Sequence, residues 1–191
     1  MKKAALHNLG CKVNAYETEA MQEILEKHGY EIVPFGEKAD VYLINTCSVT
    51  NIADRKSRQM LHRARKMNPD AVVIAAGCYV QAAGRELLQD SSVDILIGNN
   101  EKANLPEILK AWEEEHDASH IHDLTREHTY EELSLSHTAE HTRAYMKIQD
   151  GCNQFCTYCI IPYTRGRVRS RKIEDIEAEA KRLAVVIKKS S

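Results

Sequence analysis

The stretch Val41-Tyr42-Leu43-Ile44 is a continuous apolar run, as expected for a β-strand that is covered on both faces. On both sides of this run, strands and helices alternate over residues 1–110. Strands are predicted at 4–9, 30–35, 71–76 and 93–97, and helices at 14–28, 51–67, 84–89 and 103–115. Strands separated by helices imply an α/β fold with a doubly wound parallel sheet.

Three cysteines follow three of these strands. Cys11, Cys47 and Cys78 each come directly after a predicted strand, at the sheet edge where open α/β folds bind ligands. A lone cysteine there is usually a small buried hydrophobe, but three at equivalent strand ends favour shared metal ligation. We therefore expect them close together at one end of the sheet. Without metal their sulfurs need not lie at ligand distances, because metal relieves the repulsion between thiolates.

A second group of three cysteines has the spacing C-x3-C-x2-C. Cys152, Cys156 and Cys159 follow a predicted strand over 145–150. Three thiolates so close together on one loop cannot all pair as disulfides, but all three can face one soft metal centre. A four-iron cluster usually takes four cysteines, so three would leave one iron open to bind a substrate. The alternative is a zinc knuckle, which needs a nearby fourth ligand, and no Cys or His follows Cys159.

Composition is that of an ordinary globular protein, with 191 residues, 43% hydrophobic and 28% charged. The formal net charge is −2, so any affinity for nucleic acid must come from local patches. The first residues lack the apolar run of a signal peptide, and no stretch approaches the roughly twenty apolar residues of a membrane span. Six cysteines in such a chain indicate metal ligation in a cytoplasmic protein before disulfides.

Two basic segments are candidate RNA contacts. A predicted helix carries Arg55, Lys56 and Arg58, and a later segment carries Arg165, Arg167 and Arg169. Either segment could simply be a solvated surface, and the alternative is that it contacts the phosphates of an RNA. Six of the nine histidines lie within 116–143, but their spacings repeat no ligand pattern, so a plain linker is favoured over a metal site.

Leu9-Gly10-Cys11-Lys12-Val13-Asn14, Ile44-Asn45-Thr46-Cys47-Ser48-Val49-Thr50 and Ala76-Gly77-Cys78-Tyr79 resemble the N-terminal domain of the methylthiotransferases, and C-x3-C-x2-C resembles the radical S-adenosylmethionine (SAM) superfamily. The resemblance implies an N-terminal domain (1–115) with an auxiliary 4Fe-4S cluster on Cys11, Cys47 and Cys78. A linker (116–143) and the start of a radical SAM domain (144–191) would follow, with a second 4Fe-4S cluster that binds SAM through Cys152, Cys156 and Cys159. It also implies tRNA and an electron donor as partners, and no membrane.

In this family one SAM methylates a sulfur at the auxiliary cluster, and a second yields the radical that removes hydrogen from C2 of a tRNA adenine. Lys12-Val13-Asn14 and Lys56-Ser57-Arg58 look most like the branch that acts on N6-threonylcarbamoyladenosine beside the anticodon. The branch that acts on isopentenyl-adenosine usually reads Gln-Met-Asn after its first cysteine. Two alternatives stay open: that second substrate, or a non-catalytic iron–sulfur or zinc module that binds RNA.

The resemblance covers about residues 1–184. Radical SAM domains are partial or full α/β barrels, and barrels run to roughly 200 residues, whereas 40 residues remain from Cys152 onward. We therefore expect an incomplete enzyme that is inactive alone, with residues 1–110 folding as a unit and residues 144–191 mobile or poorly packed.

Overall fold

A computed structural model of the chain describes residues 1–124, 127, 129–136 and 144–189. Among these residues, six strands form one sheet in the order β2-β1-β3-β4-β5-β6, and every neighbouring pair is parallel. The strands are β1 (Lys3–Asn8), β2 (Glu31–Ile32), β3 (Val41–Thr46), β4 (Val72–Gly77), β5 (Ile95–Ile97) and β6 (Ser119–His120). The apolar run at 41–44 lies in β3, near the middle of the sheet, and the predicted α/β class is confirmed.

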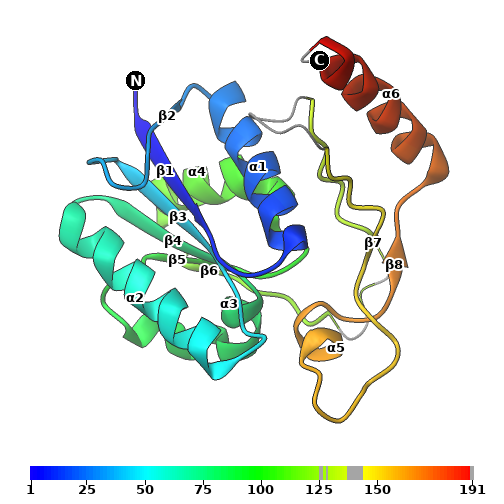
Figure 1. Ribbon diagram of the computed structural model, residues 1–191. Coiled ribbons are helices and arrows are strands. Elements are labelled where there is room, and N and C mark those ends of the chain that lie inside the picture. The colour runs from blue at the N-terminus through cyan, green and yellow to red at the C-terminus, as the bar shows by residue number, and fades with distance from the viewer. Residues whose placement is uncertain (125–126, 128, 137–143, 190–191) are drawn as a thin grey trace.

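Helices cover both faces of the sheet, as a doubly wound fold requires (Figure 1). They are α1 (Lys12–Lys27), α2 (Asn51–Met67), α3 (Cys78–Ala83) and α4 (Leu105–Glu115), with 3-10 turns η1 (Gly84–Gln89) and η2 (Lys102–Asn104). Side chains of β3 alternate between the two faces: Tyr42 packs in one core cluster with Leu61 of α2, and Leu43 packs in the other with Met21 of α1. Each face of β3 is thus buried by a helix layer, which explains its unbroken apolar sequence.

Helix α1 begins earlier than predicted. Asn14 was expected to open this helix, but the helix begins at Lys12 with Cys11 as its N-cap residue. The side-chain oxygen of Asn14, the atom that would cap a helix, instead accepts a hydrogen bond from Nη2 of Arg165.

The sheet extends into the segment expected to be a linker. Strand β6 lies within residues 116–143 and pairs with β5, and Leu133 and Leu135 in the same segment are buried. Three of the six histidines noted there, His128, His137 and His141, lie outside the described residues.

The last part of the chain packs against the sheet domain, contrary to the expected poor packing of 144–191. Its elements are β7 (Gln149–Asp150), α5 (Ile161–Thr164), β8 (Arg169–Ser170) and α6 (Ile173–Lys189), and β7 pairs antiparallel with β8. Thr164 and Glu179 are fully buried, and Leu183 joins a core cluster with Tyr16 of α1. Buried contacts on α1 explain the difference, because they give this segment a partner that its own sequence does not reveal. None of the helices in the described part of the chain has the length and apolarity of a membrane span.

Candidate metal centres

The structure places Cys11, Cys47 and Cys78, the sheet-edge cysteines, after three neighbouring strands. Cys11 follows β1, Cys47 follows β3 directly, and Cys78 follows β4 as the first residue of α3. The three strands are parallel and adjacent, in a register that pairs residue 8 with 45 and residue 46 with 77. All three thiols therefore leave the same carboxyl edge of the sheet.

The sheet-edge cysteines also affect one another electrostatically. All three are free thiols, with Cys47 and Cys78 buried and Cys11 exposed. Burial raises the pKa of the Cys47 thiol, a backbone hydrogen bond from Val49 opposes this rise, and the nearby Cys78 and Cys11 add to it. Binding of a metal requires thiolates, so these thiols would release protons as the metal binds.

Two glycines let the backbone approach this edge. Gly10 has φ +102°, and a Cβ there would lie 2.7 Å from Sγ of Cys47. Gly77 has φ +97°, and a Cβ there would lie 2.5 Å from Oδ1 of Asn45, a buried oxygen that accepts no hydrogen bond from the described residues. A cavity of about 230 Å³ lies beside Cys47 and is lined also by Gly10 and Lys56. There is thus room for a bulky group next to this thiol.

The donor set fits a soft metal or an iron–sulfur cluster. Within the described residues, no three Cys, His, Asp or Glu side chains are already grouped to hold a metal ion. Three thiols at one sheet edge, with free space beside one of them, nevertheless supply the ligand type that iron–sulfur clusters and zinc prefer. The three sulfurs are expected to reach ligand distances only when a metal binds, because thiolates repel one another without it.

Cys152, Cys156 and Cys159, the loop cysteines, lie between β7 and α5. All are free, with Cys156 exposed and the other two half-buried. The amide of Cys152 donates to the carbonyl of Gly166 at 3.0 Å, which fastens the start of the loop to the segment after α5. Gly151 is required there, since its φ is +77° and a Cβ would lie 2.1 Å from the carbonyl oxygen of Arg167.

Aromatic packing holds the middle of this loop. Phe155 adopts φ +48°, an uncommon value for a non-glycine residue, and its ring meets Tyr163 edge-on at 5.8 Å. The guanidinium of Arg167 lies 5.3 Å from the centroid of the same ring. Tyr158, in contrast, is 92% exposed and does not pack in the loop. The loop thus presents three free thiols on a backbone that is anchored at its start and middle.

A buried charge network lies between the two cysteine groups, and no local pattern in the sequence indicates it. Glu17 of α1 is fully buried and pairs with Lys102 at 2.9 Å, Lys147 at 2.7 Å and Arg165 at 2.9 Å. Arg165 also pairs with Asp150 at 3.0 Å. Burial acts to raise the pKa of the Glu17 carboxyl, but the three cations together hold it well below its usual value.

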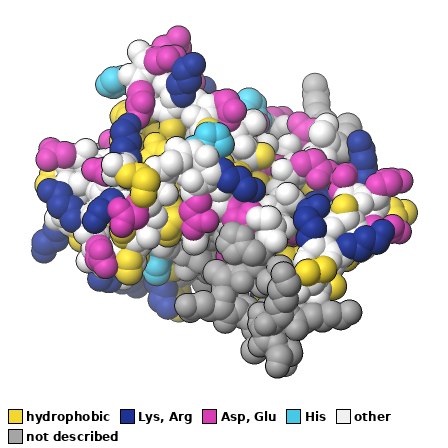
Figure 2. Space-filling view, turned by 90° about the horizontal axis from the view of Figure 1, so that it is seen from above, with side chains coloured by type: hydrophobic (Ala, Val, Ile, Leu, Met, Phe, Trp, Pro, Cys, Tyr) yellow, Lys and Arg dark blue, Asp and Glu magenta, His cyan; other side chains and the backbone are white. Residues whose placement is uncertain are grey.

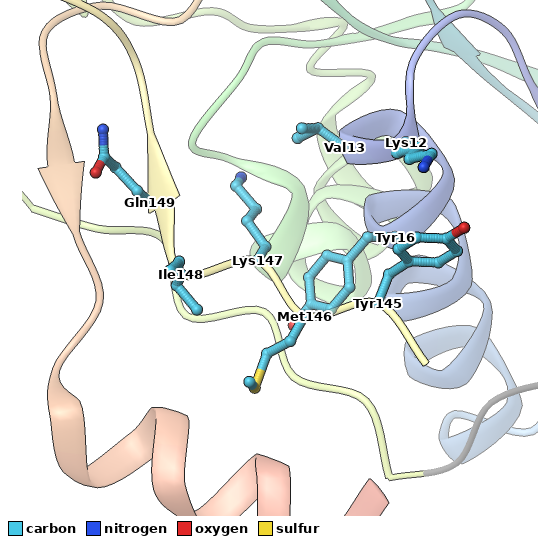
Figure 3. Close-up of a pocket in the computed structure, with 8 residues that line it drawn as sticks. All are labelled: Lys12, Val13, Tyr16, Tyr145, Met146, Lys147, Ile148 and Gln149. Atoms are coloured by element: carbon cyan, nitrogen blue, oxygen red, sulfur yellow. The ribbon is translucent and has the colours of Figure 1, made fainter. Parts of the chain in front are cut away.

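A small cavity lies against this network. It measures about 210 Å³ and is lined by the start of α1 and by residues 145–149. Figure 3 shows Lys147 and Met146 pointing to opposite sides of the chain, with Tyr145 and Tyr16 beside each other. The ammonium of Lys12 lies 5.1 Å from the centroid of the Tyr145 ring. Lys12, which lines the cavity, directly follows Cys11 in the sequence.

The six predicted RNA contacts divide into exposed and buried residues. Arg55, Lys56 and Arg58 of α2 are exposed, and so is Arg167. Arg165 and Arg169 are only 4% and 2% exposed, so the prediction that they contact RNA is not supported. Arg165 is instead engaged by carboxylates, and Arg169 donates to the carbonyl of Arg167. Acidic and basic side chains are mixed over the face seen in Figure 2.

Comparison with known proteins places both cysteine groups in described families. Residues 3–98 match the Uncharacterized protein family UPF0004, and residues 146–189 match the Radical SAM superfamily. A solved structure of the radical SAM methyltransferase TsrM from Kitasatospora setae superposes with a TM-score of 0.58 at 14% identity. That match covers 97% of this chain and 46% of the other, and it supports the fold.

Relatives of known function share higher identity. The chain is 43% identical to the threonylcarbamoyladenosine tRNA methylthiotransferase MtaB of Bacillus subtilis and 40% identical to that of Aquifex aeolicus. It is 35% identical to the tRNA-2-methylthio-N(6)-dimethylallyladenosine synthase of Rickettsia conorii. These matches cover 96%, 95% and 94% of this chain but 41%, 45% and 42% of the relatives, so the chain spans less than half of their length. The chain belongs to the methylthiotransferase family of radical SAM enzymes.

Proposed function

We propose that the protein acts in the cytoplasm as a tRNA methylthiotransferase that adds a methylthio group to C2 of N6-threonylcarbamoyladenosine next to the anticodon. The observation that carries this proposal is the pairing of two separate groups of three free cysteines in one compact chain. A protein with a single metal site would need only one such group of cysteines. Adding both a sulfur and a methyl group to one carbon calls for two groups.

Each part of the chain has its own proposed role. Residues 1–115 form the methylthiotransferase domain, whose sheet-edge cysteines would hold an auxiliary 4Fe-4S cluster. Residues 144–191 form the start of the radical SAM domain, whose loop cysteines would hold the 4Fe-4S cluster that binds SAM, with residues 116–143 between the two domains. The chemistry that a bound cluster supplies is one-electron cleavage of SAM, which the C2 position needs because its hydrogen is not acidic. The electron must come from a separate donor.

The protein groups around the thiols prepare these sites. Gly10 and Gly77 lack a Cβ that would otherwise collide with Sγ of Cys47 and with Oδ1 of Asn45, so the backbone can pass close to these side chains. The exposed Arg55, Lys56 and Arg58 provide positive charge on α2 for the phosphates of the tRNA. Adenine next to the anticodon lies in a single-stranded loop, where bases can leave the stack and enter a protein pocket.

The threonylcarbamoyl substrate is favoured over the isopentenyl one on two grounds. The relatives named for threonylcarbamoyladenosine are 43% and 40% identical, against 35% for the dimethylallyladenosine synthase. Cys11 is also followed by Lys12-Val13-Asn14 rather than Gln-Met-Asn. We expect the 191 residues by themselves not to turn over, because they span about 41% of the length of the Bacillus subtilis relative.

The test is to delete the gene in its host and analyse the tRNA nucleosides by mass spectrometry. We expect methylthio-threonylcarbamoyladenosine to disappear and its unmethylthiolated parent to accumulate, while methylthio-isopentenyl-adenosine stays unchanged. A gene that encodes these residues within the full length of the relatives should restore the product, and the same gene carrying Cys47→Ala or Cys156→Ala should not. A gene that encodes the 191 residues alone should not restore it either. Loss of the isopentenyl product instead would assign the other substrate, and unchanged tRNA would favour a module that only binds RNA.

A further inference from the structure

We infer that Asn14 and Arg165 form a bridge that fixes the loop cysteines relative to the sheet-edge cysteines. The bridge is a positioning device, and its value for catalysis rests on the proposed function, in which both cysteine groups serve one substrate. The contacts themselves do not depend on that function. They link three segments that are far apart in the sequence and that all lead into a cysteine.

Asn14 holds two of the sheet-edge loops with one side chain. Its Nδ2 donates to the carbonyl of Leu9 at 2.8 Å and to the carbonyl of Thr46 at 2.9 Å. Leu9 lies two residues before Cys11, and Thr46 lies directly before Cys47. Asn14 is 1% exposed, so no water competes for these donors. Its remaining polar atom, Oδ1, accepts a hydrogen bond from Nη2 of Arg165 at 2.8 Å.

Arg165 carries the connection onward to the loop cysteines. Its Nη1 donates to Oδ1 of Asp150 at 3.0 Å and to Oε1 of Glu17 at 2.9 Å. The same Oδ1 of Asp150 accepts from the amide of Gly151 at 2.8 Å, one residue before Cys152. Both nitrogens at the end of the guanidinium are therefore engaged, one toward each cysteine group.

A second bridge runs parallel to the first and reaches the third sheet-edge cysteine. Asn99 is fully buried, and its Nδ2 donates to the carbonyl of Thr164 at 2.7 Å and lies 3.6 Å from Sγ of Cys78. Its Oδ1 accepts from Nζ of Lys102 at 2.6 Å, which fixes the orientation of the amide. All three sheet-edge loops are thus tied to residues 164–165.

The directional chemistry of these contacts indicates that they position the segments, beyond stabilising the interface between them. Apolar side chains of similar volume often stabilise an interface as well as buried ion pairs do, or better. Planar amide and guanidinium groups, however, accept partners only in defined directions, so they specify one arrangement of the segments that they join. Such precision has a use between two reactive centres, because a displacement of about 1 Å can cost on the order of a hundredfold in rate.

The test measures the distance between the two groups in the reduced, metal-free chain, so that its outcome is independent of clusters and activity. Cys47, Cys78, Cys152 and Cys159 are replaced by Ser, which leaves the two exposed thiols of Cys11 and Cys156. The chain is then treated with a series of bis-maleimides of increasing span, and the intramolecular crosslinks are quantified by mass spectrometry. Circular dichroism establishes that each variant is folded.

We expect one preferred crosslinker span in the parent chain and a shifted or broadened preference after Asn14→Ala. The matched control is Asn68→Ala, because Asn68 is also a buried asparagine that binds a backbone carbonyl, that of Ala39, but contacts neither cysteine group. The control should keep the parent's span. If Asn14→Ala does not fold, the same crosslinking is carried out on Arg165→Lys. That variant keeps the positive charge, but its single amine cannot bind Asn14 and Asp150 together. An unchanged span in the folded variant overturns the inference, and so does loss of folding in both variants, which would assign the bridge to stability alone.

Discussion

Replacing Glu17 with Gln should strongly destabilise the chain, because this carboxylate balances three buried cations. Lys102, Lys147 and Arg165 lie within 2.9 Å of its oxygens, and all three are 5% exposed or less. In the variant, Asp150 still forms ion pairs with Lys147 and Arg165. Lys102 loses its ion pair with residue 17 and keeps its hydrogen bond to Oδ1 of Asn99.

The expected cost follows from this imbalance of charge. Removing one partner of a buried ion pair costs about 3–5 kcal/mol, since the remaining charge stays buried without compensation. Native domains are stable by about 5–15 kcal/mol, so Glu17→Gln should remove a large share of the total. The side chain keeps its size and one acceptor oxygen, which separates the effect of charge from that of packing.

Urea denaturation of the reduced, metal-free chain, followed by circular dichroism, measures the free energy of unfolding. The matched control is Glu114→Gln, which removes the same charge from an exposed i,i+4 pair with Lys110 and should cost about 0–1 kcal/mol. Adding Lys102→Met to Glu17→Gln removes one uncompensated cation and should recover part of the loss. Equal destabilisation by the two Glu→Gln variants would refute the reasoning.

The difference in the free energy of unfolding between the parent chain and Glu17→Gln should also depend on pH. The pKa of Glu17 is held below its ordinary value of 4.5, so its contribution to stability is fully present above that pH. The contribution is lost as pH falls below 4.5 toward the folded-state pKa, because the unfolded chain then binds the proton more readily. The difference in stability between the parent and Glu17→Gln should therefore shrink in acid, and a difference that grows there would contradict the assigned direction of the shift.

Two further predictions concern the metal and the RNA. Gly10→Ala should lower the iron bound at the sheet edge, because the new Cβ would lie 2.7 Å from Sγ of Cys47. Gly29→Ala is the control, since Gly29 also has positive φ but no atom within 4 Å of its added Cβ, and equal iron in both variants would contradict the prediction. Arg55→Ala should weaken tRNA binding and reduce the slope of log affinity against log salt by about 1, whereas Lys110→Ala on α4 should leave that slope unchanged. A salt series of binding titrations measures both slopes, and equal slopes would argue against α2 as the tRNA surface.

The sheet and the grouping of cysteines could be predicted because both depend on local signals. A run such as 41–44 identifies a buried strand by itself, and a cysteine directly after a strand lies at the carboxyl edge in any parallel sheet. Cys11, Cys47 and Cys78 could therefore be assigned to one edge without knowing how any side chain packs. The short strand β6 was missed because Ser119 and His120 are polar and show no strand pattern over two residues.

The charge network could not be predicted for a different reason. Glu17 and Arg165 are 148 positions apart, and charged side chains are almost never fully buried unless they are paired. Without a partner in view, Arg165 and Arg169 were interpreted as surface residues that contact RNA. The spacing of Asn14 and Glu17 on one face of α1 was available as a signal, but it indicated a helix start as readily as a buried contact.

In the proposed function, this chain provides two independent cysteine sites. Anaerobic reconstitution with iron and sulfide, followed by an iron and sulfide count per chain, tests it most directly. We expect two clusters of about four irons each in the parent chain. Cys156→Ala should remove the iron of one cluster and leave the other, because the two ligand sets share no residue. Loss of all iron in that variant, or tightly held zinc in place of iron, would show that the two cysteine groups do not hold two independent iron–sulfur clusters.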